Sequence, residues 1–163
     1  MLWVSVAAIF LVAASGLRFW SVENPVRLHV GFALAGTLLG LFAHTMTMFY
    51  FIGTGKKIKD FIAEWDEQVR NDLRAKIIVM KRKLFPWMTL ICGLLMAAFI
   101  MGGAADAQLV SKGTHAIIAY VALIGHVHVS AMESIYIFRN LDLIHEVNDR
   151  ARKRTPPPVA KQG

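Results

Sequence analysis

The sequence predicts an all-α integral membrane protein, a four-helix bundle that forms a single domain over residues 1–163. Three observations predict this class. The chain is 56% hydrophobic with a mean hydropathy of +0.49. Charged residues make up 18% of it, whereas soluble domains carry about 25%. The apolar residues form long continuous runs rather than alternating patterns, which favours helices over strands.

Four apolar runs are long enough to cross a bilayer, which takes roughly 20 residues of helix. They are residues 1–20, 26–53, 85–105 and 114–138. The first run has no basic residue ahead of it, so we interpret it as a retained helix rather than a cleaved signal peptide. Pro25 predicts the start of the second helix, because proline is favoured at the first helical position. The single Cys92 excludes a disulfide framework and a cysteine-based metal cluster.

The basic residues predict the orientation in the membrane. Of the 18 lysines and arginines, 15 lie in residues 54–84 or 139–163. Basic connections stay on the cytoplasmic side, so both termini are expected there, in a multi-pass protein of a bacterial-type inner (plasma) membrane. This placement accounts for the net charge of +7 without nucleic acid as a partner. The partner that it implies is the lipid bilayer.

The connection of residues 54–84 is not a simple loop. Its apolar residues recur at helical spacing with charges between them, which predicts an amphipathic cytoplasmic helix between the second and third spans. It is either a helical extension of the spans or a helix at the lipid headgroups. A docking surface for a partner subunit is the alternative. Residues 139–163 are expected to form a cytoplasmic tail.

A weak internal repeat relates the two halves of the chain. A shift of 84 residues aligns Trp3 with Trp87, His44 with His128 and Met48 with Met132. This predicts a tandem repeat of two parallel helical hairpins, residues 1–53 and 85–138, about a pseudo-two-fold axis along the membrane normal. Other shifts of the sequence against itself also align some histidines. A shift of 82 pairs His44 with His126, and a shift of 86 pairs His29 with His115.

Five of the six histidines lie on the second and fourth spans. Ionisable residues inside a membrane are costly and mark functional sites. A haem iron takes two axial imidazole nitrogens, and facing helices with histidines at equal depth supply them. The repeat selects His44 and His128 as ligands of a haem b, with Gly40 and Gly125 leaving space beside the macrocycle. Tight helix packing is the alternative explanation of the small residues.

A second haem would use residues nearer the outer ends of the same spans. The candidates are His29, His115 and His126. His29 and His44 lie roughly 60° apart around a helix, and His115 and His128 roughly 140° apart. His126 shares a face with His115 much better than His128 does. Glu133 is expected to meet water or a basic neighbour, with proton exchange beside a quinone as the alternative.

The spans at 26–53 and 114–138 resemble those of small membrane b-type cytochromes in their facing histidines and glycine- and alanine-rich approaches. The resemblance is generic and implies one haem b, or two, in an electron-transfer subunit that meets quinone or other redox subunits. Such a subunit is expected more than a self-contained enzyme. The first alternative is a copper-binding or copper-handling protein, since imidazole and thioether ligands suit Cu(I). Its ligands would be His44, Met48, His128 and Met132. The second alternative is a cofactor-free structural subunit of a membrane complex.

Overall fold

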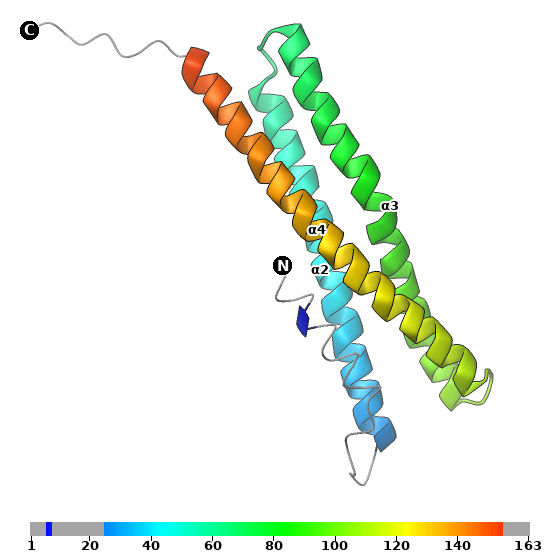
Figure 1. Ribbon diagram of the computed structural model, residues 1–163. Helices are drawn as coiled ribbons and strands as arrows, with labels where there is room; N and C mark the ends of the chain where they lie inside the picture. The colour runs from blue at the N-terminus through cyan, green and yellow to red at the C-terminus, as the bar shows by residue number, and fades with distance from the viewer. Residues whose placement is uncertain (1–5, 8–24, 155–163) are drawn as a thin grey trace, which may run out of the picture.

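Three long helices run side by side in the computed structural model, which describes residues 6–7 and 25–154 (Figure 1). They are α2 (Pro25–Phe61), α3 (Glu67–Asp106) and α4 (Lys112–Arg154). The chain turns back at each short connection, so α3 is antiparallel to α2 and α4. Each of the three is long and apolar enough to cross a bilayer. By length and composition these are the helices of a membrane protein. The helix α2 begins at Pro25, as predicted.

The prediction of a four-helix bundle is wrong, because the described residues contain three helices. The span expected at residues 1–20 falls outside the described residues except for 6–7. The expected hairpin of residues 1–53 therefore lies partly outside them as well. The three helices are unusually long for membrane spans. At 37, 40 and 43 residues, they are about twice as long as a bilayer span requires.

Of the two forms expected for residues 54–84, the structure shows the helical extension and not a separate amphipathic helix between the spans. Residues 54–61 continue α2, and residues 67–84 form the first part of α3. The connection is thus a helical extension of its two neighbours, with a short turn between them. The expected tail likewise begins inside α4, which continues to Arg154. The apolar residues keep their helical spacing past the lipid boundary, so each extension has a buried face and stays helical.

A stripe of apolar side chains on α3 forms the centre of the bundle. Its buried members recur at intervals of three and four residues: Leu73, Ile77, Met80, Leu84, Met88, Ile91 and Leu95. The stripe on α4 has the same spacing and contains Ala122, His126, Val129, Glu133, Tyr136, Asn140, Leu143 and Val147. Spacing near 3.5 residues keeps one seam of each helix facing its partners, as in a coiled coil.

Side-chain caps fix the two connections. The carboxylate of Asp66 accepts hydrogen bonds from the backbone N–H groups of Gln68 and Val69 at the start of α3. The hydroxyl of Ser111 accepts one from the N–H of Thr114 at the start of α4. Both are N-cap positions, where a side-chain oxygen satisfies a backbone donor that has no partner within the helix.

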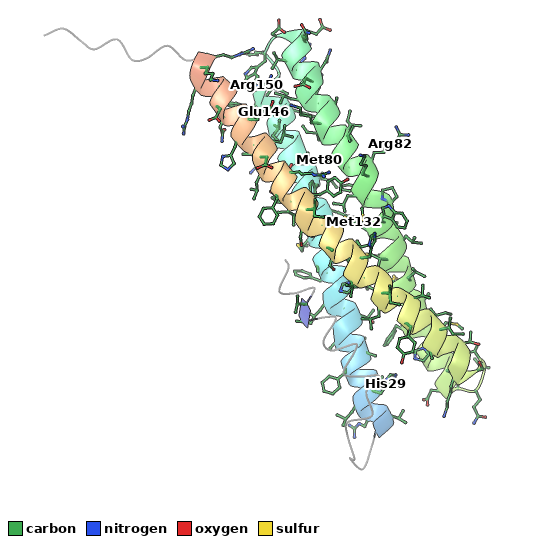
Figure 2. The ribbon with its side chains drawn as sticks, viewed as in Figure 1. His29, Met80, Arg82, Met132, Glu146 and Arg150 are labelled. Carbon is green, nitrogen blue, oxygen red and sulfur yellow. The ribbon has the colours of Figure 1, made fainter. Side chains whose placement is uncertain are left out.

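The bundle has an apolar half and a charged half. Large exposed hydrophobic residues cover the part that contains residues 26–52, 87–100 and 117–138. Ion pairs gather in the other half, where Lys76 contacts Glu146 at 2.9 Å and Asp72 at 3.2 Å. Figure 2 shows Glu146 and Arg150 near one end of the bundle and His29 near the other. The apolar surface matches contact with lipid, and the ion pairs match contact with water.

The packing can be tested with two neighbouring isoleucines on α3. Ile77 is 2% exposed and Ile78 is 55% exposed. We expect Ile77→Ala to lower the free energy of unfolding by about 2–5 kcal/mol, because it opens a cavity in the core. Ile78→Ala should change it by about 0.5 kcal/mol or less, as surface substitutions do. Thermal unfolding in detergent, followed by circular dichroism, measures both. Equal losses in the two variants would contradict the assignment of the buried stripe.

Candidate functional site

A buried cluster of three ionisable side chains joins α2 to α4. His44 on α2 places its Nδ1 2.7 Å from Oε1 of Glu133 and its Nε2 2.8 Å from Nδ1 of His126. His44 is 0% exposed, His126 2% and Glu133 4%. All three lie within the part of the bundle whose surface is apolar. The cost of burying them is offset because each is hydrogen-bonded to another.

The hydrogen-bond pattern assigns a direction to this cluster. An ionised carboxylate only accepts, so the Nδ1–H of His44 donates the hydrogen bond to Oε1 of Glu133. The Nε2 of a neutral His44 is then an acceptor and takes the N–H of His126 Nδ1. The carboxylate fixes both the tautomer and the orientation of His44, as carboxylates that bond the free ring nitrogen of metal-ligating histidines do. A chain of this kind can also pass protons within a membrane.

Gly40 and Gly125 each allow a close contact between helices, but with different neighbours. A Cβ at Gly40 would lie 3.1 Å from Cδ1 of Leu95 and 3.4 Å from Cε1 of His126. Gly40 therefore lets α2 approach the His126 ring, near the place where the sequence predicts space for a macrocycle. A Cβ at Gly125 would meet Cδ1 of Ile91 at 3.0 Å instead. Gly125 serves the contact between α4 and α3.

The other predicted site residues lie around the cluster rather than in it. His128 is exposed, and its ring lies 6.4 Å from the ring of Trp87 on α3. The structure therefore pairs His44 with His126, where the 84-residue repeat pairs it with His128. Met48 and Met132 are partly buried and pack against the apolar core. The assignment of any of these residues as a haem or copper ligand stays a prediction.

A second pair of histidines joins the same two helices. The rings of His29 on α2 and His115 on α4 lie 6.2 Å apart, with their planes at 86°. His115 also lies against α3, where a Cβ at Gly102 would be 3.1 Å from its Cε1. Figure 2 shows His29 toward the end of the bundle farthest from Glu146 and Arg150, and His115 lies beside it. The structure thus brings together the outer residues that the sequence proposed for a second haem.

A third polar contact between α2 and α4 lies toward the charged half. Asn140 is 2% exposed, and its amide nitrogen donates to the hydroxyl of Tyr50 at 3.0 Å and to Oγ1 of Thr54 at 3.2 Å. A buried amide of this kind fixes register, because any other alignment would leave it without partners. The contact holds α2 and α4 in the register that pairs His44 with His126.

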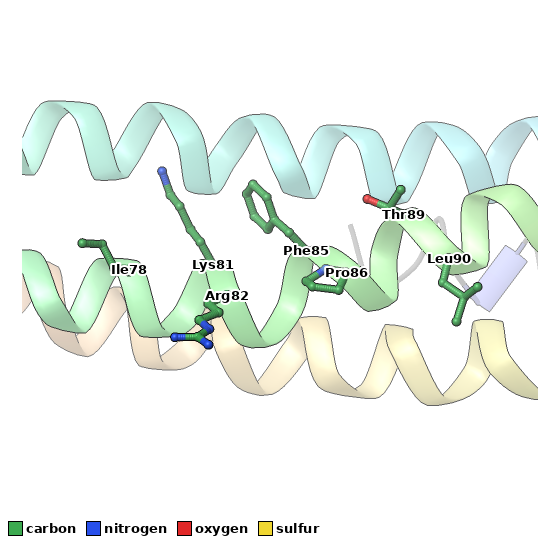
Figure 3. Close-up of a pocket in the computed structure, with 7 residues that line it drawn as sticks. All are labelled: Ile78, Lys81, Arg82, Phe85, Pro86, Thr89 and Leu90. Atoms are coloured by element: carbon green, nitrogen blue, oxygen red, sulfur yellow. The ribbon is translucent and has the colours of Figure 1, made fainter.

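A groove on α3 is separate from this cluster. It is lined by residues of α3 alone, with Lys81 and Arg82 on one side and Phe85, Pro86 and Leu90 on the other (Figure 3). Lys81 extends toward α2, where a Cβ at Gly55 would lie 2.9 Å from its Nζ. The groove thus lies where the charged half of α3 meets the apolar half. The histidine cluster belongs to α2 and α4.

Sequence reasoning named Glu133 but did not place it in this cluster. The sequence predicts that it meets water or a basic neighbour, but it is buried and contacts His44. A signal was present in the sequence. His126, Glu133 and Asn140 recur every seven residues, which places all three on one face of α4. Polar residues at such spacing inside a membrane span indicate a shared, non-lipid face.

Comparison with known proteins yields no relative: no protein-family model, curated protein or solved structure matches the chain. Among the described residues, no group of three or more histidine, cysteine, aspartate or glutamate side chains is arranged to hold a metal ion. A bis-histidine haem takes its two axial ligands from the protein, so two facing imidazoles are the relevant set for that cofactor. The function has to be argued from these side chains.

Two glycines of α2 test the close approach at the cluster. We expect Gly40→Ala to destabilise the protein by about 1–3 kcal/mol, because the added methyl overpacks against Leu95 and the His126 ring. A Cβ at Gly31 would have no atom within 4 Å. Gly31→Ala should therefore stabilise the helix by about 0.5–1 kcal/mol. Thermal unfolding in detergent gives both signs. Stabilisation by Gly40→Ala would contradict the tight contact at the cluster.

Proposed function

We propose that the protein is a membrane-integral, b-type cytochrome-like electron-transfer subunit, with a haem b held between α2 and α4 by His44 and His126. One observation supports this most directly. Two imidazoles from different helices meet inside an apolar bundle, and a carboxylate holds the outer nitrogen of one of them. The haem would exchange electrons with quinone or with a partner redox subunit. When bound, it supplies the one-electron chemistry, and the protein supplies ligands, orientation and a low dielectric.

The distance between the ring nitrogens of His44 and His126 can be compared with that expected on either side of a haem iron. Metal–imidazole bonds of about 2.0 Å on opposite sides of one iron separate the two nitrogens by about 4 Å. The nitrogens of His44 and His126 lie 2.8 Å apart. His44 and His126 would hold the haem through these two nitrogens, in place of the hydrogen bond that now joins them. Glu133 keeps its bond to Nδ1 of His44 throughout, so Nε2 stays directed at the site.

His126 fits the ligand role better than His128 for two reasons. Its ring is buried and bonds His44, whereas the ring of His128 is exposed and lies beside Trp87 of α3. It also lies 11 residues past His115, which places the two roughly 20° apart around the helix. Two ligands on α4 that serve neighbouring sites need to share a face.

Ligand identity can be read from the spectrum of the purified full-length protein. We expect a Soret band and sharp visible bands on reduction, and His44→Ala or His126→Ala should abolish the inner haem because each removes an axial ligand. His145→Ala is the matched control, since His145 is exposed in the charged half of α4. His128→Ala should also keep the haem. Loss of haem in His128→Ala but not in His126→Ala would restore the repeat pairing and overturn this assignment.

Metal analysis of the same preparations separates haem from copper. Copper without haem, lost equally in Met48→Ala and Met132→Ala, would contradict the haem proposal and favour thioether ligands. Under the haem proposal these methionines pack near the core, so their replacement should change the spectrum little. A protein with neither cofactor would leave the buried cluster as a structural contact in a membrane complex.

The charged half of the bundle is proposed to lie in the cytoplasm. It contains most of the basic residues, and such residues are retained on that side of an inner membrane. A reporter fused after Gly163 should therefore be active in its cytoplasmic form and inactive in its periplasmic form. The matched test is a fusion in the connection at residues 107–111, which should give the opposite result. Periplasmic activity after Gly163 would reverse the orientation without changing the helices.

A further inference from the structure

The open groove on α3 joins a cationic end to an apolar part along one face of the helix. Side chains four residues apart form rows along a helix, with grooves between neighbouring rows. Arg82, Pro86 and Leu90 belong to one such row, and Lys81 and Phe85 belong to the next. Figure 3 shows Lys81 directed toward α2 and Arg82 directed away from it, so the two cations flank the end of the groove. Past them the lining is mainly apolar.

The two cations have no counter-ion in the part of the chain that the structure describes. The ion pairs among residues 25–154 include neither Lys81 nor Arg82. Residues 78–90 of α3 and 53–59 of α2 each contain three basic residues and no acidic one. Burial of its side chain and the nearby charge of Lys59 both lower the pKa of Lys81. A partly buried cation in this position is stabilised by an anion that comes from outside the chain.

The contact between Lys81 and α2 sets the level of the groove in the bilayer. A Cβ at Gly55 would lie 2.9 Å from Nζ of Lys81. Gly55 comes two residues after the apolar run of 26–53, and Lys81 comes four residues before the run of 85–105. The change from apolar to charged residues therefore lies at one level on both helices. Trp87 is 49% exposed close to this level, as is typical of tryptophan beside lipid headgroups.

We propose that this groove binds one anionic phospholipid, with its phosphate between Lys81 and Arg82 and an acyl chain along Phe85, Pro86 and Leu90. A guanidinium presents two parallel N–H donors to a phosphate, and an ammonium adds a second positive charge. Basic pockets on membrane helices bind anionic headgroups in this way. A zwitterionic headgroup brings a cation of its own, which the two unpaired cations repel. The site is independent of the proposed haem.

The test is the binding of single lipids to the full-length protein in detergent, measured by native mass spectrometry. The probes are phosphatidylglycerol and phosphatidylcholine with identical acyl chains. Phosphatidylglycerol is expected to bind more tightly. The double variant Lys81→Gln/Arg82→Gln should bind phosphatidylglycerol about 30-fold more weakly, as expected for the loss of two basic contacts with an anionic headgroup. Equal affinity of the wild type for the two lipids would overturn the proposal.

The double variant Lys56→Gln/Lys57→Gln is the matched control. It removes the same charge at the same level of the bundle, but on α2, where Lys57 lines a separate groove against α4. Its affinity for phosphatidylglycerol should equal that of the wild type. If both double variants lose affinity equally, the lipid responds to the overall surface charge and the proposed site is wrong. Circular dichroism checks that each variant is folded.

A further pair of variants tests the apolar part of the site without changing any charge. Leu90→Trp places an indole in the groove and should weaken binding of phosphatidylglycerol. Leu38→Trp is the control, because Leu38 is exposed to a similar extent on α2, at 56% against 52% for Leu90. Equal effects of the two would contradict a place for the acyl chain on α3.

Inorganic phosphate distinguishes a lipid from a free anion at the same cations. In excess it should leave phosphatidylglycerol bound, because it has no acyl chain to occupy the apolar part of the groove. Displacement of the lipid by inorganic phosphate would overturn the lipid as the occupant.

Discussion

Burying a polar group in an apolar bundle is costly unless it finds a hydrogen-bond partner on the chain itself, and the interface between α2 and α4 is arranged around this constraint. In the hydrocarbon of a bilayer there is no water to hydrogen-bond an unsatisfied polar group. His44 therefore bonds Glu133 and His126, and Asn140 bonds Tyr50 and Thr54. These contacts also hold the helices together. Lipid tails are as apolar as the helices, so association depends on hydrogen bonds and close packing rather than on the hydrophobic effect.

The three helices divide this work between them. The buried stripe of α3 consists of leucine, isoleucine and methionine, and it supplies packing. The stripe of α4 alternates apolar positions with His126, Glu133 and Asn140, each seven residues from the next. A seven-residue repeat keeps one seam facing one partner along the helix. The polar seam therefore faces α2 at successive levels, and a single register satisfies all of its members.

Much of the fold can be read from the sequence, but not the pairing of helices. The apolar runs at 26–53, 85–105 and 114–138 lie within the three observed helices, because a bilayer span is a property of local composition. The helices are longer than these runs. The change from apolar to charged residues at positions such as Lys56 alters the exposed face and not the helical hydrogen bonding, so the helices continue past it.

The histidine pairing depends on how α2 and α4 sit against each other, and no single helix contains that information. An ungapped shift of the sequence selects His128 as the partner of His44. The angles around the helix favour His126, which lies close to the face of His115, and the structure agrees with the angles. Glu133 could have been found in the same way. Its seven-residue offset from His126 and from Asn140 indicates a common face, whereas a charge count treats it as an isolated carboxylate.

The depths of the two pairs follow from distances along each helix and do not depend on the contacts between helices. On α2, His44 lies 12 residues before Lys56, where the charges begin, which is about 18 Å along the axis. On α4, His126 lies 13 residues before Arg139, or about 20 Å. The same measure places His29 about 40 Å and His115 about 36 Å from these boundaries. Two helices with different sequences thus place their histidines at similar distances from the points where their charges begin, as the contacts between the paired rings require.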